Sequence, residues 1–314
     1  MIHIKSFAKI NLSLDVGSVM ENGMHPVDMI MQQTTLHDDV IVDVKDSRDF
    51  SIVLKTDSDK IPHDSGNIAV RAAKRMIDEY KNRKPEEAEK DTKKEICIVI
   101  EKHIPVAAGL AGGSGNAAAV IHALNALWEL DLSLAELCEI GKSLGSDVPF
   151  CVMGQAKENP TLPRKVREDR LAVSCARARG TGTELEPVPA LRAHLLIAKP
   201  DIEVSTAEVY RGIDNYVIEN RPDNDKLERI MTTGKTELMK EEMINVLECY
   251  TLDAYPEVRT LKETLKEKLT DAVHILMSGS GPSIFAVFDD EGSAIEGFKS
   301  IKALACEVHL CKAM

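Results

Sequence analysis

The sequence lacks long apolar runs and has few aromatic residues. None of its apolar stretches approaches the roughly 20 residues that a membrane-spanning helix requires. Phe, Trp and Tyr together make up only 4% of the chain. Residues 1–9 have neither the apolar core nor the small-residue cleavage site of a signal peptide. We therefore expect a protein that acts in the cytoplasm and does not enter a membrane.

Cysteine pairs and metal-binding patterns are also missing. The seven cysteines include no Cys-x-x-Cys pair, and the nine histidines include no His-x-x-x-His pair. This pattern favours free thiols in a reducing compartment and predicts neither a disulfide framework nor a zinc site. The 39 basic residues are outnumbered by 51 acidic ones, for a net charge of −12. Such a charge disfavours nonspecific binding to nucleic acid or to an anionic membrane, so any phosphate site must be built from local groups.

The length and the apolar pattern predict two domains that mix strands and helices. Domains usually span about 100–200 residues, so a chain of 314 residues has room for two. Alternating or β-branched runs predict a mostly antiparallel sheet, with strands at 7–16, 40–44, 50–54 and 96–100. Helical spacing predicts helices at 67–80 and around 120–128, and the charged stretch 81–94 reads as solvated. A capping-box pattern, Ser133 with Glu136, begins a further helix that ends near Gly145.

The second half of the chain has a different pattern. We predict a strand at 193–198, helices at 207–213, 225–230, 237–247 and 257–269, and two strands, 275–277 and 283–288, around a turn. Residues 156–175 contain two prolines and mixed charges with little periodicity, which predicts an exposed loop or an insertion. We place the domain boundary there, with an N-terminal domain at 1–175 and a C-terminal domain at 176–314.

A glycine-rich segment at 105–119 is the clearest chemical signal, because it lies between a strand and an amphipathic helix. Its glycines allow sharp turns, and the following helix N-terminus directs N–H groups and a partial positive charge at a ligand. This pattern predicts a phosphate-binding loop, and a flexible turn packed through small residues is the alternative. A dinucleotide fingerprint at 113–118 is disfavoured because residues 102–112 separate it from the strand. A P-loop ending in Gly234-Lys-Thr236 is disfavoured because Arg229 stands where its first glycine belongs.

The glycine-rich segment resembles the phosphate loop of the GHMP kinases, a superfamily that includes galactokinase, homoserine kinase and mevalonate kinase. Three other segments resemble family motifs in the same order: 8–12, 144–149 and 278–283. The resemblance runs from about residue 6 to residue 289. It implies an α+β, two-domain GHMP kinase fold, with an N-terminal ribosomal-protein-S5-like sheet-and-helix domain and a C-terminal ferredoxin-like α+β domain.

Four further segments resemble the members of the superfamily whose acceptor alcohol carries cytidine diphosphate: 9–12 with Gly23-x-His25, 145–149, 180–185 and 204–210. This resemblance implies transfer of the ATP γ-phosphoryl group, with Mg²⁺, to the 2-hydroxyl of 4-diphosphocytidyl-2-C-methyl-D-erythritol. The reaction belongs to the non-mevalonate (MEP) route to isoprenoids. The implied partner is a small-molecule substrate, with no nucleic acid or membrane, and the implied assembly is a monomer or weak homodimer.

The resemblance also implies roles for individual residues. Asp147 would accept the proton of the acceptor hydroxyl, and Lys9, placed opposite it, would stabilise developing negative charge. Taken alone, Asp147 reads as a helix-end carboxylate and Lys9 as a surface lysine. The implied ATP-binding residues are Pro105, Ala107, Gly109, Leu110, Ala111, Gly112, Gly113, Ser114, Gly115, Asn116, Asn67 and Lys102. The resemblance implies that Asn67 lies beside adenine and that Lys102 flanks that pocket. A helix N-cap and strand-end solvation are the respective alternatives.

At the cytidine end, a flat base needs a stacking face and partners for its polar edge. The resemblance implies that Tyr210 stacks on cytosine and that His25 bonds its edge, with Asn11 and Thr206 nearby. The alternative for Tyr210 is a helix aromatic packed in the core. The chain departs from the family where Met24 replaces a common tyrosine, where Gly115 replaces the second serine of the phosphate loop, and where residues 156–175 interrupt a usually direct connection from a strand after Asp147 to Gly180.

Two other functions stay open at this point. The first is a sister kinase for homoserine or a mevalonate-type alcohol, whose pocket needs an arginine for a carboxylate; Tyr210 and His25 disfavour it. The second is a catalytically silent, nucleotide-binding homologue, which the presence of both Lys9 and Asp147 disfavours.

Overall fold

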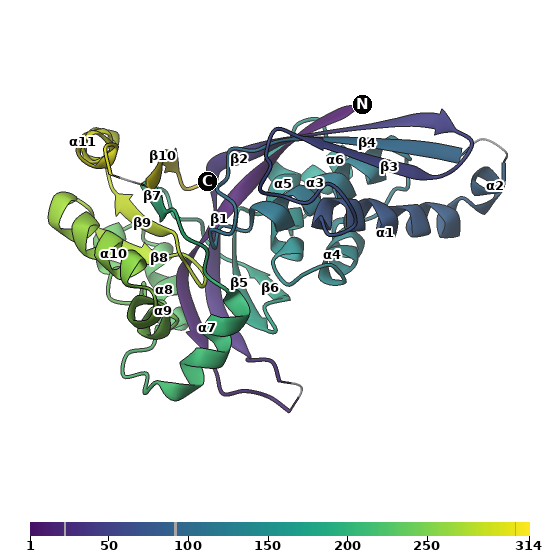
Figure 1. The fold of residues 1–314 in the computed structure, drawn as a ribbon. Coiled ribbons are helices and arrows are strands. Elements are labelled where there is room, and N and C mark those ends of the chain that lie inside the picture. Colours follow the sequence, from purple (N-terminus) through teal and green to yellow (C-terminus); the bar gives the residue numbers. More distant parts are fainter. Residues whose placement is uncertain (22, 91–92, 305) are drawn as a thin grey trace. The chain divides into compact units, whose positions relative to one another are not determined.

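The structure, a computed structural model, describes residues 1–21, 23–90, 93–304 and 306–314. The chain packs into two compact units. Unit 1 comprises Met1–Ala8, His37–Val106 and Ala111–Ser174, and unit 2 comprises Lys9–Leu36, Ala107–Leu110 and Cys175–Met314. Two long strands, β1 (Ile2–Val16) and β2 (Val27–Ser47), contribute residues to both units (Figure 1). A division of the domains at residue 175 stays our prediction, and two earlier segments of the chain pack with unit 2.

The sheet of unit 1 is built from β2, β3 (Ser51–Thr56) and β4 (Lys93–Glu101), in the order β3-β4-β2. The β2–β4 pair is antiparallel, whereas β3 runs parallel to β4. Alternate residues of β4, Ile96, Ile98 and Ile100, are fully buried. This period of two is the pattern of a strand with one face against a core, and it confirms the strand predicted at 96–100.

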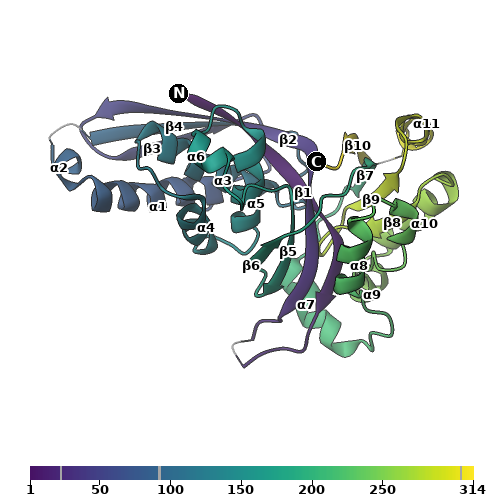
Figure 2. The ribbon, with the colours of Figure 1, turned by 180° about the vertical axis from the view of Figure 1, so that it is seen from behind.

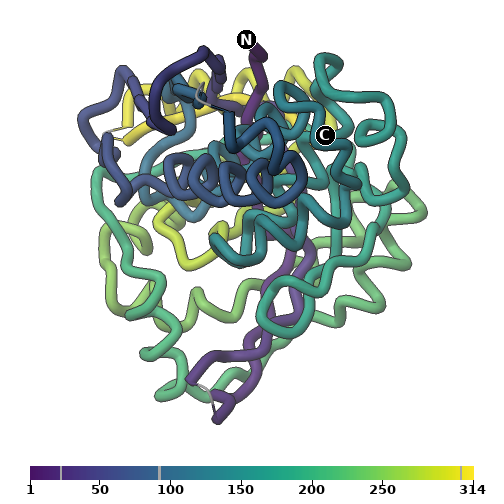
Figure 3. Tube along the Cα trace, turned by 90° about the vertical axis from the view of Figure 1, so that its right-hand side faces the viewer, coloured from purple at the N-terminus to yellow at the C-terminus, as the bar shows by residue number. Residues whose placement is uncertain are grey.

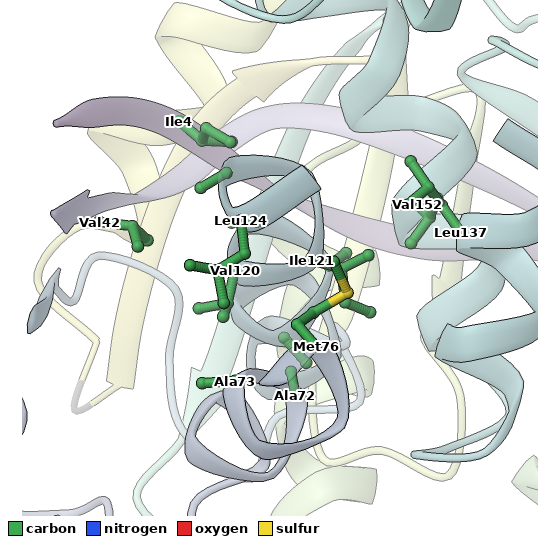
Figure 4. Close-up of a cluster of buried hydrophobic side chains, with 14 of the residues drawn as sticks. Ile4, Val42, Ala72, Ala73, Met76, Val120, Ile121, Leu124, Leu137 and Val152 are labelled. Carbon is green, nitrogen blue, oxygen red and sulfur yellow. The ribbon is translucent and has the colours of Figure 1, made fainter. Parts of the chain in front are cut away.

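Helix α3 (Gly112–Leu127) forms the centre of unit 1 and is buried on almost every side. Figure 4 shows Val120 and Leu124 of this helix between side chains of the sheet and those of α1 (Ile68–Arg83). On the other side lie α4 (Leu134–Lys142) and α5 (Val148–Glu158), which carry Leu137 and Val152. The predicted capping box of α4 is present, with the Ser133 hydroxyl and the Glu136 carboxylate each bonding the other residue's backbone N–H. Helix α3 is thus packed between the sheet and α1 on one side and α4 and α5 on the other (Figure 4).

A loop prediction for unit 1 is wrong. Residues 156–175 are not an exposed loop, because α5 continues to Glu158, α6 (Arg164–Arg167) follows, and Leu162, Val166 and Ala172 are buried in the core of unit 1. The sparse apolar side chains anchor the segment while its charges stay outside. The stretch 81–94 contains the end of α1, the short α2 (Pro85–Ala88) and the start of β4, with residues 91 and 92 outside the described residues. Its described residues are exposed or half-buried, which confirms that the stretch is solvated.

Unit 2 contains a four-stranded antiparallel sheet in the order β10-β7-β9-β8, formed by Cys306–Lys312, His194–Pro200, Ile284–Phe288 and His274–Met277. Helices α10 (Pro256–Lys268) and α11 (Glu291–Ile301) lie on the same side of this sheet (Figures 1 and 2). Gly297 allows α11 to approach closely, because a Cβ there would lie 3.1 Å from side chains of Leu196 and Phe288.

The remainder of unit 2 pairs β2 with β5 (Cys175–Gly180), which in turn pairs with β6 (Glu184–Pro187). Its other helices are short: α7 (Thr206–Gly212), η1 (Ile213–Asn215), α8 (Asn224–Met231), η2 (Thr236–Leu238) and α9 (Glu248–Ala254). No helix in the described part of the chain combines the length and the apolar composition that a bilayer crossing needs.

The helix predicted at 237–247 is wrong, and the reason lies in the backbone hydrogen bonds. Only η2 is helical in that range, whereas Leu14 of β1 accepts from Val246 N at 2.9 Å and donates to Ile244 O at 2.8 Å. The Asn245 side chain also donates to Met277 O and Gly279 O. These tertiary bonds hold residues 244–246 against β1, and the residues before them form turns, so the helical spacing is overridden.

Candidate active site

The glycine-rich segment divides at the start of α3. Ala107, Gly109 and Ala111 all have positive φ, of 51°, 72° and 56°, a region in which non-glycine residues are strained. The helix begins at Gly112, so the later glycines form its first turn rather than a loop. No side chain caps this helix at Ala111, and the first N–H groups of a helix have no partner within it. An uncapped N-terminus of this kind suits an anion such as a phosphate.

The first half of the segment, Ala107–Leu110, packs in unit 2 against the other glycine motif. The Ser278 hydroxyl donates to Gly109 O at 3.0 Å, and Lys9 N donates to Leu110 O at 3.0 Å. A Cβ at Gly109 would lie 2.3 Å from Ser278 O and 2.9 Å from Gly281 O, so a side chain cannot be accommodated there. The structure therefore brings together three of the segments that the sequence singled out: the opening strand, the glycine-rich segment and residues 278–283.

Lys9 and Asn11 lie two residues apart on β1 and contact each other. Lys9 is only 4% exposed, and its Nζ donates to Asn11 Oδ1 at 2.7 Å. Asn11 is fully buried, with its Nδ2 3.2 Å from Met29 Sδ. Residues two apart on a strand share a face, so the pairing follows from the local backbone. The interpretation of Lys9 as a surface lysine is wrong.

The predicted cytidine-binding residues also meet within unit 2. The rings of His25 and Tyr210 have centroids 5.8 Å apart, and the turn that joins β1 to β2 lies beside α7 (Figures 1 and 3). His25 Nδ1 is 2.9 Å from Gly17 O, and its Nε2 is 3.5 Å from Asp214. Sequence reasoning missed Asp214, which lies in η1 directly after α7. Thr206 Oγ1 lies 2.8 Å from the Ser280 hydroxyl, which sits in the other glycine motif.

Asn67 and Lys102 behave differently from one another. Asn67 is the N-cap of α1, since its Oδ1 accepts from Ala69 N at 2.9 Å, and this confirms the alternative interpretation of that residue. Its role beside adenine stays a prediction. Strand-end solvation is wrong for Lys102, whose side chain is 8% exposed and forms an ion pair with the fully buried Asp38. Asp38 was missed because nothing in the sequence separates it from neighbouring Asp39.

Asp147 directly precedes α5 in unit 1, and its side chain does not cap that helix. The chain after it is helical, so the strand expected after Asp147 is wrong. Ile68 at the start of α1 lies 3.5 Å from a Cβ position at Gly113 and 3.7 Å from one at Gly145. The Ile68 side chain is therefore the point at which three segments meet: the start of α1, the start of α3 and the turn before Asp147. Lys9 belongs to unit 2, and its pairing with Asp147 around an acceptor hydroxyl stays a prediction.

Two buried polar contacts join α3 to α5. Burial lowers the pKa of His122 to about 4, so the ring is neutral at pH 7, and its Nε2 lies 2.8 Å from Val152 O. Gln155 Nε2 donates to Gly115 O at 2.8 Å. These contacts hold α3 against α5, the helix that Asp147 directly precedes.

Gly115 faces the hydroxyl of Ser6, which is fully buried and has no hydrogen-bond partner among the described residues. A Cβ at position 115 would lie 2.5 Å from that hydroxyl oxygen. We expect Gly115→Ala to destabilise the protein by about 1–2 kcal/mol through overpacking. With Ser6→Ala also present, the same change should instead stabilise it by about 0.5–1 kcal/mol, because alanine favours a helix. Urea unfolding of the four proteins measures this coupling, and equal effects of Gly115→Ala in both backgrounds would contradict it.

The described residues contain no group of three or more His, Cys, Asp or Glu side chains that could hold a metal ion. Mg²⁺ in phosphoryl-transfer sites is commonly held by one or two carboxylates together with substrate phosphates. The described side chains are therefore compatible with a magnesium ion that arrives bound to ATP.

Comparisons with known proteins match both halves of the chain to one family. The family model for the GHMP kinases N terminal domain matches residues 67–155, and that for the GHMP kinases C terminal domain matches residues 221–304. A 4-diphosphocytidyl-2-C-methyl-D-erythritol kinase of Alkaliphilus metalliredigens is 38% identical over 98% of this chain and 95% of its own length. One from Clostridioides difficile is 40% identical over 96% of this chain and 91% of its own length.

Among solved structures, a 4-(cytidine 5′-diphospho)-2C-methyl-D-erythritol kinase superposes with a TM-score of 0.75 at 24% identity, over 99% of both chains. A homoserine kinase from Cytophaga hutchinsonii superposes with a TM-score of 0.61 at 17% identity. These likenesses support the two-domain α+β fold that the sequence predicted.

Proposed function

The chain belongs to the GHMP kinases, in the family of the 4-diphosphocytidyl-2-C-methyl-D-erythritol kinases, and from this membership we propose that it phosphorylates the 2-hydroxyl of 4-diphosphocytidyl-2-C-methyl-D-erythritol with ATP. The product would enter the non-mevalonate route to isoprenoid precursors. The observation that carries the choice of substrate is the contact between His25 and Tyr210, because an aromatic face beside a polar ring suits a nucleobase. We expect the reaction to occur in the cytoplasm, with the protein as a monomer or weak homodimer.

On the nucleotide side, the first turn of α3 would bind the phosphates of ATP. The N–H groups of Gly112, Gly113 and Ser114 lie at the uncapped end of the helix, where the helix dipole favours negative charge. Mg²⁺, bound to the β- and γ-phosphate oxygens, would neutralise part of their charge. The close packing of Gly109 on Ser278 and Gly281 would hold the preceding backbone in one conformation.

On the acceptor side, the roles that we propose for Lys9 and Asp147 follow from the demands of phosphoryl transfer. The Asp147 carboxylate would accept the proton of the 2-hydroxyl as the new bond to phosphorus forms. The Lys9 ammonium, fixed by Asn11, would stabilise negative charge on the transferring group. A positioned cation costs no reorganisation during the reaction, so its burial on β1 favours this role.

An ADP-release assay tests the proposed reaction. The purified protein with ATP and Mg²⁺ should release ADP rapidly with 4-diphosphocytidyl-2-C-methyl-D-erythritol and slowly with homoserine or mevalonate. Release of ADP with one of the other two alcohols instead would identify a sister kinase. ATP binding without turnover of any of the three would identify a silent homologue.

Tyr210→Leu should raise KM for the cytidine-bearing substrate about tenfold, because stacking of a base on an aromatic ring contributes about 1–3 kcal/mol. KM for ATP should stay within about twofold, since the substitution removes no phosphate-binding group. Steady-state kinetics with each substrate varied in turn provide the measurement. Tyr216→Leu, which removes a tyrosine hydrogen-bonded to Asp253 in the same unit, is the matched control. An equal change in KM for the alcohol in both variants would argue against stacking by Tyr210.

A further inference from the structure

Asp38 is a fully buried carboxylate on β2 that binds three donors at the entrance to the glycine-rich segment. Its Oδ1 accepts from the backbone N–H groups of His103 and Ile104, at 2.8 Å each. Its Oδ2 accepts from the Lys102 ammonium. Residues 102–104 follow β4 and lead directly to Pro105, so one side chain fixes both the backbone and the charge at this point of unit 1.

The Lys102 ammonium lies beside the first residue of α3. A Cβ at Gly112 would be 3.2 Å from Lys102 Nζ and 3.1 Å from Ile104 Cγ2. A cation at a helix N-terminus is repelled by the helix dipole, which favours anions there. The Lys102 side chain is 8% exposed, so solvent screens this repulsion only weakly. A buried counter-anion is therefore needed to keep the ammonium in place, and Asp38 is that anion.

We propose that Asp38 is a positioning residue for ATP, which holds the Lys102 ammonium at the phosphate-binding end of α3. This inference rests on the proposed function, because it assigns the anion at that helix end to the phosphates of ATP. Lys102 supplies the positive charge that attracts the phosphates, and Asp38 acts only through Lys102 and through the backbone of residues 102–104.

Asp38 could affect ATP binding directly through its negative charge, or indirectly by positioning Lys102. These two explanations predict opposite effects of Asp38→Asn on the affinity for ATP. If Asp38 affected ATP only as a nearby negative charge, its removal would lower the repulsion of the phosphates and tighten binding of ATP. If Asp38 positions Lys102, its removal releases the ammonium and weakens binding. We expect Asp38→Asn to raise the Kd for ATP about tenfold, the effect of one charge-assisted hydrogen bond. KM for ATP should rise in parallel, with kcat and KM for the alcohol within about twofold.

Asp38→Asn leaves a buried ammonium without its partner and can impair folding, so a second variant is required. Asp38→Asn combined with Lys102→Met removes both charges and keeps the side-chain volume, a change that folded proteins tolerate well. We expect this double variant to unfold near the wild-type temperature and still to bind ATP about tenfold more weakly. Asp46→Asn is the matched control, because Asp46 of β2 pairs with Lys94 of β4 at the surface. We expect Asp46→Asn to leave the Kd and the KM for ATP unchanged.

Equilibrium dialysis of the full-length protein with ATP and Mg²⁺, without any alcohol, measures the Kd for ATP and so tests the inference separately from turnover. Wild-type affinity in the folded double variant, or tighter binding in Asp38→Asn, would overturn the role of Asp38. An effect of Asp46→Asn as large as that of Asp38→Asn would also overturn it. Failure of the wild-type protein to phosphorylate the cytidine-bearing alcohol would refute the substrate assignment instead, and leaves the dialysis result unaffected.

Discussion

Replacement of Asp147 by asparagine should lower kcat at least about 10²-fold, because the amide cannot accept the proton of the acceptor hydroxyl. The side chain does not cap α5, so the substitution removes no capping hydrogen bond from the helix. The fold should therefore persist, and KM for ATP should change little. Steady-state kinetics and thermal unfolding of the same preparation would separate a loss of chemistry from a loss of structure.

Asp131→Asn is a suitable control for that experiment. Asp131 is a surface carboxylate, 81% exposed, and its φ of 51° is one that asparagine adopts readily. Asp131→Asn removes one negative charge from the same unit as Asp147→Asn does, without touching the proposed site, so kcat should stay at the wild-type value. A near-normal rate for Asp147→Asn would remove Asp147 from the role of general base.

Gly109→Ala should destabilise the protein by about 2–4 kcal/mol, which combines a left-handed backbone penalty with a steric clash. The φ of Gly109 is +72°, and the added Cβ would lie 2.3 Å from Ser278 O, a backbone atom that cannot rotate away. Because the clash lies between the glycine-rich segment and residues 278–281, activity should fall as well. Urea unfolding followed by circular dichroism gives the change in the free energy of unfolding.

Gly234→Ala isolates the backbone penalty from the clash. Gly234 has a φ of +68° and no atom within 4 Å of a Cβ position. It should cost about 1–2 kcal/mol from the left-handed conformation alone. The excess cost at Gly109 then measures the contact with Ser278, and equal costs at the two positions would show that the contact is loose.

The sequence predicted the elements whose signal is local. The capping box of α4, the β-branched residues of β4 and the two strands that flank residues 278–283 are present as expected. Lys9, Asn11, His25 and Tyr210 could be chosen only through a family resemblance, since no local pattern marks these residues as functional. In the structure, Lys9 donates a hydrogen bond to Asn11, and the ring of His25 lies beside that of Tyr210.

The errors arose where tertiary contacts override local spacing. Residues 244–246 have a helical apolar pattern, but Leu14 satisfies their backbone groups and keeps them extended. Residues 156–175 look polar, yet a few apolar side chains anchor them in the core. Asp38 could not be identified from the sequence, because the three donors that its carboxylate binds lie more than 60 residues away in the chain.

Unit 2 takes strands from both ends of the chain, and this has a consequence for its synthesis. Thr34 pairs with Ala313, Gln32 Nε2 donates to Met314 O at 2.7 Å, and β10 pairs along the whole of β7. A ribosome must therefore complete residues 306–314 before β7 gains its neighbour on that side. Until then the nascent chain presents β7 as an open edge, which can pair with other polypeptides.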